Sequence, residues 1–336
     1  MPATYKDIQR LTGFSLSTIS RYFNGEKLKP ANRAAIEAAA EQLDFRMNDF
    51  ARGLRSRKAK TVGLLIPDLK SLFSTTIMYQ VGKLLREHGY GSFVCDCNMD
   101  INTEKEVVNF FISKSVDGII TIPFDPDPKY LELTRARNVP VVFINRTVLP
   151  SQLDGVMIDN FDASRLASEY LLSKGHKKTA IISHFLRHRP VSDRLTGFLS
   201  SFPESNPEYH THVIMKPNTV DNGHLAVREL FSAPNDATAL YCTNYELTLG
   251  AYAALSELDI KFPRDISFIG FDNMQLTEVI RPSMTIIEQP LEQMALEAVN
   301  LLFRRLENGA SPPYEKIVLK AKLIEGESVA DIRNKP

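Results

Sequence analysis

Residues 4–25, TYKDIQRLTGFSLSTISRYFNG, decide the fold of the first part of this 336-residue chain. Thr4 with Asp7 three residues later is a helix-start pattern, because their side chains can satisfy backbone N–H groups of the first turn. Gly13 supplies the left-handed residue that ends a helix, and Ser15 can cap a second helix. Two short helices that meet at a glycine turn are typical of a helix-turn-helix.

The second predicted helix, from Leu16 to about Asn24, is expected to contact DNA. In helix-turn-helix proteins this helix lies in the major groove, where an arginine such as Arg21 matches the two acceptors of guanine. Arg21 alone would more often be a solvated surface arginine, so its assignment depends on the surrounding pattern. A third helix is expected from about Asn32 to Asp44. The predicted DNA contacts of this head are Thr4, Leu16, Ser17, Thr18, Ser20, Arg21 and Asn24.

The charge of the chain is unevenly distributed, although the net charge is zero. Residues 1–60 contain twelve Lys and Arg against six Asp and Glu, whereas the rest of the chain contains twenty-eight against thirty-four. A basic head on an acidic body favours a polyanion as the partner of the head. A solvated helical surface would carry the same charge, so charge alone does not decide.

Three motifs carry a resemblance to a known family: STISRYFNG (residues 17–25), LDFRMN (43–48) and ARGLRSRKAKTVGLLIPD (51–68). Their order and spacing resemble the N-terminus of the LacI/GalR family of bacterial transcription regulators, and a looser resemblance continues along the chain. Two departures stand out. YFNG replaces the more common VLNG, and KLKPANR (27–33) replaces the usual start of the third helix.

Residues 48–58 form a short basic segment with a glycine at position 53, too short to be stable as an isolated helix. By itself the segment reads as a flexible basic linker. The resemblance implies a hinge helix that forms on DNA and inserts its leucine, Leu54, into the minor groove, as apolar wedges do in DNA-bending proteins. The predicted DNA contacts here are Asn48, Arg52, Leu54 and Arg55.

From residue 61 onward, apolar β-branched segments alternate with helix-length segments, which predicts parallel sheets with helices on both faces. Two such series predict two lobes. The expected fold class is therefore α/β, an all-helical helix-turn-helix head followed by a two-lobed body. We expect a head at 1–46, a hinge at 47–60 and an effector-binding and dimerisation domain at 61–336. Lobe 1 would take about 61–160 and 290–321, and lobe 2 about 161–289 and 322–336.

The body resembles a periplasmic sugar-binding protein, as the family's effector domain does, so polar residues at strand ends are candidate ligand contacts. Asp272 in GFDN matches the family's sugar-hydroxyl acceptor, and Arg194 in DRLTGF matches its cleft arginine. For the other candidates, capping of a strand-to-helix turn is about as good an explanation. The predicted effector contacts are Phe73, Asn145, Arg194, Asn218, Asn244, Asp272 and Gln289.

The charge of the effector is suggested by a loop rich in cations. Arg187, His188, Arg189 and Arg194 lie within eight residues, and residues 217–223, PNTVDNG, lack the aromatic residue that many relatives use to stack a sugar ring. Such a site would suit a sugar acid or a sugar phosphate. A solvated basic loop explains Arg187 and Arg189 slightly better.

Other function classes leave few signals in the chain. The sequence contains neither GxGxxG after its first strand nor GxxxxGK[ST], which argues against a nucleotide-dependent enzyme. Its three cysteines and seven histidines have no metal-site spacing, so we expect neither metal nor cofactor. No apolar run is long enough to span a membrane, and the start of the chain has no signal-peptide core. We expect a cytoplasmic protein that does not act at a membrane.

These features together predict a sequence-specific DNA-binding regulator, a repressor of carbohydrate or sugar-acid genes that acts as a homodimer on a pseudo-palindromic operator. A small effector between the lobes would control it. Two alternatives remain: a cytoplasmic sugar-binding sensor without a DNA-binding role, and an α/β sugar-modifying enzyme.

Overall fold

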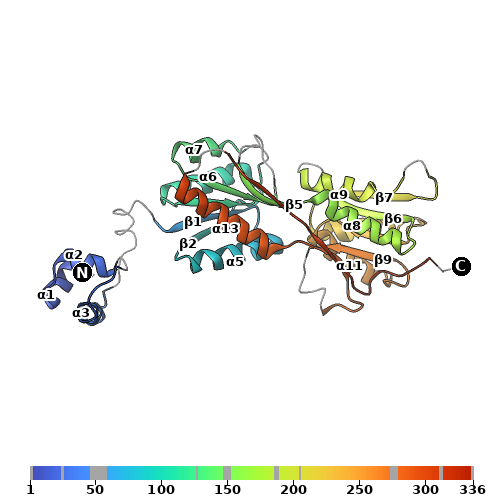
Figure 1. The fold of residues 1–336 in the computed structure, drawn as a ribbon. Helices are drawn as coiled ribbons and strands as arrows, with labels where there is room; N and C mark the ends of the chain where they lie inside the picture. Colours follow the sequence, from blue (N-terminus) through green and yellow to red (C-terminus); the bar gives the residue numbers. More distant parts are fainter. Residues whose placement is uncertain are drawn as a thin grey trace. The chain divides into compact units, whose positions relative to one another are not determined.

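The computed structural model describes residues 3–23, 26–45, 59–125, 128–146, 153–184, 189–203, 206–272, 279–309 and 313–333. The chain divides into two compact units, residues 1–60 and 61–336 (Figure 1), which are described separately. No helix in the described ranges is both long and apolar enough to cross a membrane.

In its described residues the first unit is a bundle of three short helices: α1 (Tyr5–Thr12), α2 (Leu16–Phe23) and α3 (Pro30–Gln42). The Asp7 carboxylate accepts hydrogen bonds from the backbone N–H of Thr4 at 2.8 Å and from its hydroxyl at 2.7 Å. Gly13 ends α1 with φ +70°. These contacts explain why α1 begins and ends where the capping pattern predicts. The third helix begins two residues earlier than predicted, because a proline is well accommodated in a first turn.

The core of the head is small and apolar. Ile8, Ile19 and Ile36, one from each helix, are fully buried. The rings of Tyr5 and Phe23 stack on one another with centroids 5.3 Å apart. Burial of one isoleucine per helix fixes which faces of the helices remain exposed.

The second unit contains two six-stranded sheets in its described part. The first sheet has the strand order β11-β5-β4-β3-β1-β2 and is entirely parallel. We call this sheet with its covering helices the first lobe. Its strands are β1 (Thr61–Ile66), β2 (Gly91–Asp96), β3 (Gly118–Thr121), β4 (Val141–Ile144), β5 (Asp154–Ile158) and β11 (Lys316–Leu319), and its helices are α5 (Leu72–Glu87), α6 (Ile101–Ser113), α7 (Tyr130–Ala136) and α13 (Leu291–Asn308).

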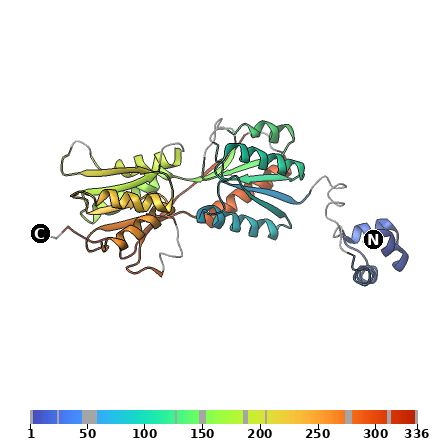
Figure 2. The ribbon, with the colours of Figure 1, turned by 180° about the vertical axis from the view of Figure 1, so that it is seen from behind.

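The second sheet has the order β12-β10-β9-β8-β6-β7, and only the β10–β12 pair is antiparallel. This sheet and its helices are called the second lobe (Figure 2). Its strands are β6 (Lys178–His184), β7 (His210–Lys216), β8 (Ala239–Cys242), β9 (Ser267–Phe271), β10 (Thr285–Glu288) and β12 (Lys322–Ile324), and its helices are α8 (Asn160–Ser173), α9 (Arg189–Leu199), α10 (Val220–Leu230) and α11 (Tyr245–Glu257).

Apolar packing places helices on both faces of each sheet. In the first lobe α5 and α13 cover one face and α6 and α7 the other; in the second, α8 and α9 lie opposite α10 and α11. The chain passes from one sheet to the other between β5 and α8, between β10 and α13, and between β11 and β12. The predicted fold class, a helical head followed by parallel α/β sheets, is confirmed.

Candidate functional site

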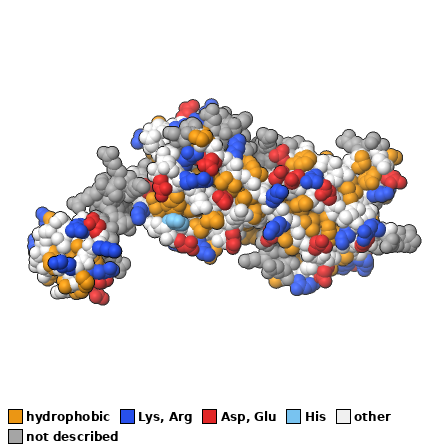
Figure 3. Space-filling view, viewed as in Figure 1, with side chains coloured by type: hydrophobic (Ala, Val, Ile, Leu, Met, Phe, Trp, Pro, Cys, Tyr) orange, Lys and Arg blue, Asp and Glu red, His pale blue; other side chains and the backbone are white. Residues whose placement is uncertain are grey.

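The face of α2 that is predicted to meet DNA is exposed. Leu16, Ser17 and Arg21 are exposed on this helix, whereas Ile19 faces the core. Thr4 at the start of α1 is also exposed, and Thr18 and Ser20 are half-buried. Lys and Arg side chains are visible on the face of the head drawn in Figure 3. The predicted contacts Asn24, Asn48, Arg52, Leu54 and Arg55 lie outside the described residues.

Several of these polar groups already have partners within the head. The hydroxyl of Ser15 pairs with those of Ser17 and Thr18 at 2.8 and 2.9 Å. Arg21 donates through Nε to Glu26 Oε2 at 2.7 Å, and both side chains are about half exposed (54% and 51%). An exposed ion pair of this kind contributes little to stability. The Arg21 guanidinium can therefore leave Glu26 at little cost to contact a base or a phosphate. Sequence reasoning did not identify Glu26 as a partner of Arg21.

In the body, two of the predicted effector contacts lie directly after strands in unusual backbone conformations. Asn145 follows β4 with φ +66°, and Asp272 follows β9 with φ +84°. Positive φ is uncommon for residues other than glycine and is concentrated at functional sites. Asn and Asp tolerate it best, so these positions combine a tight turn with a polar side chain at the carboxyl end of a strand.

Arg194, on α9, is held rigidly. Its side chain is buried, and it donates from Nε to Asn160 Oδ1 and from Nη1 to the carbonyl of Thr243, both at 2.7 Å. Its guanidinium carbon lies 3.6 Å from the centre of the Phe271 ring. Burial lowers the pKa of Arg194, and the nearby Asp272 carboxylate opposes that shift. Asn160 is therefore part of the site, although sequence reasoning did not select it.

Asp272 is the second buried charged group of the site. Its carboxylate accepts a hydrogen bond from Nε2 of Gln289, which lies on the crossover from β10 to α13. Burial raises the pKa of Asp272 to about 6, while Arg194 and the Gln289 hydrogen bond act in the opposite direction. The structure thus brings together three predicted residues, Arg194, Asp272 and Gln289.

Asn218 belongs to the same side of the second lobe. Its Nδ2 donates to Oε2 of Glu246 at 2.9 Å. The negative charge of Glu246 contributes to the raised pKa of Asp272 and opposes the lowered pKa of Arg194, so Glu246 lies near both. Glu246 was missed because, in the sequence, it reads as an ordinary acidic residue in the first turn of a helix.

The remaining predicted contacts have local roles. Asn244 stands at the N-cap of α11, where its Oδ1 accepts from the hydroxyl of Thr243 at 2.8 Å. Phe73, in the first turn of α5, is half-buried and packs against the apolar core. Arg187, His188 and the side chain of Arg189 lie outside the described residues.

A cation from the first lobe was also missed. Arg146, next to Asn145, donates from Nη1 to the carbonyl of Pro123 at 2.8 Å. Burial lowers the pKa of Arg146 to about 10, Glu104 opposes the shift, and the charge of Arg194 adds to it. The two arginines therefore lie within electrostatic reach of one another, although they belong to different lobes.

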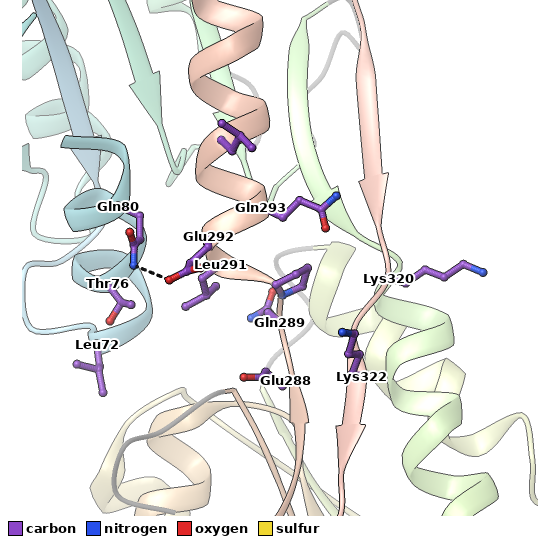
Figure 4. A pocket seen from close by; sticks show the side chains of 12 residues that line it. Leu72, Thr76, Gln80, Glu288, Gln289, Leu291, Glu292, Gln293, Lys320 and Lys322 are labelled. Carbon is purple, nitrogen blue, oxygen red and sulfur yellow. Dashed lines mark hydrogen bonds between the residues drawn. The ribbon is translucent and has the colours of Figure 1, made fainter. Parts of the chain in front are cut away.

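A groove of about 740 Å³ adjoins this cluster at Gln289. Figure 4 shows Gln289 between α5 on one side and Lys320 and Lys322 on the other. Gln80 Nε2, on α5, donates to Glu292 Oε1, on α13, at 3.4 Å, and both residues line the groove. Gln289, on the segment that connects the lobes, thus contacts Asp272 and also lines the groove. No group of three or more potential metal ligands occurs among the described residues.

Comparison with protein families gives a match over residues 59–321 to the model described as "Periplasmic binding proteins and sugar binding domain of LacI family". Among curated relatives, the HTH-type transcriptional repressor PurR of Yersinia pestis is 28% identical over 333 residues, covering 98% of this chain and 97% of the relative. PurR of Vibrio vulnificus is 27% identical over 309 residues, covering 91% and 92%.

Solved structures support the same fold. The lac repressor dimer bound to operator and the anti-inducer ONPF superposes with a TM-score of 0.85 at 21% identity, covering 98% of this chain and 100% of that one. A LacI family regulator from Enterococcus faecium with bound ribose gives a TM-score of 0.71 at 24% identity, covering 81% and 100%. Because the family model covers most of the chain and the family is one of regulators, the expectation that the protein is not an enzyme is confirmed. The chain belongs to the LacI family of DNA-binding transcriptional regulators and has a periplasmic-binding-protein-like body.

Proposed function

We propose that the protein is a cytoplasmic, homodimeric repressor that binds a pseudo-palindromic operator and is controlled by a sugar or sugar acid bound in its body. The observation that carries the effector half of this proposal is the buried cluster of Arg194, Asp272 and Gln289 at the strand ends of the second lobe. Buried charges are costly unless they are paired or used, and this cluster lies where ligands bind in open α/β sheets.

The operator half of the proposal is supported by the head. The exposed side chains of Leu16, Ser17 and Arg21 offer a thymine contact, a phosphate donor and a guanine fork on one helix. The division at 1–46, 47–60 and 61–336 fits this role, with Leu54 as the minor-groove wedge. The two PurR relatives named above, from Yersinia pestis and Vibrio vulnificus, are transcriptional repressors.

The chemistry of the effector is proposed from both lobes. Carboxylates such as Asp272 accept hydrogen bonds from sugar hydroxyls. The related regulator from Enterococcus faecium was solved with bound ribose. The guanidinium groups of Arg146 and Arg194 would hold a carboxylate or phosphate of the same molecule. Effector binding would shift the equilibrium between DNA-binding and DNA-free conformations, as inducer or as corepressor.

Selection of DNA from a random pool by the full-length protein tests this function. A two-fold-related consensus should emerge. Arg21→Ala should weaken binding to the selected operator by about 1–3 kcal/mol and relax the preference at one base pair of each half-site. Asp272→Ala should keep operator affinity but lose its response to sugars and sugar acids, measured by fluorescence anisotropy.

Failure of selection to enrich any sequence would reject the regulator function. An unchanged base preference in Arg21→Ala would remove Arg21 from direct readout. Leu54→Ala is the matched hinge variant: it should lower operator preference while leaving non-specific DNA affinity unchanged.

A further inference from the structure

Glu26 is an acidic residue beside the helix that is predicted to meet DNA. It is exposed, and it follows the last residue of α2 by three positions. A carboxylate just beyond the C-terminal end of a helix lies near the negative end of the helix dipole, which disfavours it. The same charge repels a polyanion. Neither the stability of α2 nor attraction to phosphate therefore explains an acidic residue at this position.

Two hydrogen bonds join Glu26 to Arg21. The backbone N–H of Glu26 donates to the carbonyl of Arg21 at 3.0 Å, and Nε of Arg21 donates to Oε2 of Glu26 at 2.7 Å. The backbone bond holds Glu26 close to the last turn of α2, which contains Arg21. Because Glu26 is held there, the side-chain bond restricts the Arg21 side chain to few of its rotamers.

The bond from Nε leaves most of the guanidinium able to donate to DNA. A guanidinium has five N–H donors in one plane, and Nε carries one of them. Glu26 takes that one, and among the described residues it is the only partner of the Arg21 side chain. Nη1 and Nη2 keep their donors, and one from each matches the O6 and N7 acceptors of guanine. Arg21 can therefore also contact a base while it stays bonded to Glu26.

Contact with DNA strengthens the pair of Arg21 and Glu26. In the free head, water screens both exposed groups, so the ion pair is weak. Where DNA excludes part of that water, the effective dielectric constant falls and the attraction between the two charges grows. An arginine loses side-chain entropy when it binds a base, and a carboxylate that already restricts it reduces that loss. Support of this kind favours one contact geometry over others.

We propose that Glu26 is a positioning residue that holds the Arg21 guanidinium for contact through Nη1 and Nη2 with one guanine of each operator half-site. The inference rests on the operator function proposed above, with Arg21 as a base-reading residue. Glu26 then increases selectivity and lowers overall DNA affinity, since its charge disfavours every DNA sequence alike. The opposite account is that Glu26 only competes with DNA for Arg21, and the two accounts differ in the sign of one effect.

Fluorescence anisotropy with the full-length protein and two duplexes measures that sign. One duplex carries the operator selected from a random pool. The other has one base pair replaced in one half-site, at the guanine-containing position whose preference Arg21→Ala relaxes. The ratio of the two dissociation constants should fall about tenfold in Arg21→Ala and about threefold in Glu26→Ala, as loss of one supporting ion pair implies. Glu26→Gln should lower the ratio less, since its amide oxygen still accepts from Nε.

Two controls separate the contact from the charge. Glu41→Ala removes the same charge from an exposed position on α3 and should leave the ratio unchanged. Combined with Arg21→Ala, Glu26→Ala should lower the ratio no further, because the two residues act as one unit. Glu26 is exposed, so all these variants should keep melting temperatures close to that of the wild type.

An unchanged or larger ratio in Glu26→Ala would identify Glu26 as a competitor and overturn the inference. A further loss in the Arg21→Ala background would overturn it as well. If an operator is enriched but none of its guanine positions responds to Arg21→Ala, the inference fails together with the assignment of Arg21, and the regulator function stands. If no sequence is enriched, the regulator function itself is rejected, and the inference with it.

Discussion

At the scale of single residues, the most unusual group of the body is Asp272, because burial disfavours its ionised form. Asp272 is buried, lies at φ +84°, and has a pKa of about 6 against an ordinary value of 3.8. Burial is the main cause, and it outweighs both the Arg194 charge and the hydrogen bond from Gln289. Strongly shifted pKa values of this kind cluster at functional sites.

The pH dependence of unfolding should reveal the free energy that the folded protein loses by keeping Asp272 ionised. Because the folded-state pKa lies above the unfolded one, Asp272 adds stability when protonated, and this is lost as pH rises through about 6. Asparagine tolerates the left-handed backbone at this position, so Asp272→Asn should remove the dependence of stability on pH that Asp272 causes. Its stability relative to wild type should increase by about 1.4 kcal/mol between pH 5 and pH 8. Urea unfolding at several pH values measures this difference, and a constant difference would contradict the assignment.

At the scale of elements, the second lobe depends on close packing between α10 and α11. A Cβ on Gly250 would lie 1.9 Å from the carbonyl oxygen of Val220, and one on Gly223 would lie 2.4 Å from that of Leu247. These neighbours are backbone atoms of the facing helix, which cannot move aside individually. Each helix therefore has a glycine where the other approaches. This approach places Asn218, just before α10, beside Glu246 in the first turn of α11.

Gly250→Ala should therefore destabilise the body by about 1–3 kcal/mol or more, as overpacking does. Its melting temperature should fall by several degrees. Gly82→Ala is the matched control: this helical glycine has its nearest side-chain atom at 3.5 Å, an ordinary contact. That variant should be neutral or more stable by up to about 1 kcal/mol. Equal melting temperatures for both variants would contradict the packing argument.

At the scale of the whole molecule, charge divides along the same boundary as the two compact units. Residues 1–60 carry a surplus of six positive charges and residues 61–336 a surplus of six negative ones. An acidic surplus disfavours binding of DNA by the body, and a basic surplus favours phosphate contacts by the head. The two binding activities should therefore respond differently to ionic strength.

Operator affinity should fall by about 10³-fold or more between 50 mM and 200 mM salt, as counterion release requires for several phosphate contacts. Affinity for a neutral sugar should change little over that range, since its hydrogen bonds are made to buried groups. Fluorescence anisotropy and calorimetry at matched salt concentrations test both halves. A shallow salt dependence of operator binding would argue against extensive phosphate contact by the head.

The sequence by itself determined the head, the alternation of strands and helices, and the strand-end position of Asp272. These features depend on signals that act over a few residues: a capping pair, a glycine stop, and runs of β-branched residues. The motif resemblance added the family, and the family model agrees with it.

Only the tertiary structure decided which of these groups meet. Gln289 contacts Asp272 across 17 residues, Asn218 contacts Glu246 across 28, and Arg194 contacts Asn160 across 34. Such pairs follow from the order of strands in the sheet and from how closely the covering helices approach, and neither is encoded in a local pattern. Glu246 and Arg146 were missed for this reason. Each is ordinary in its own segment, and each lies near the site only because it follows the carboxyl end of a strand in its own parallel sheet.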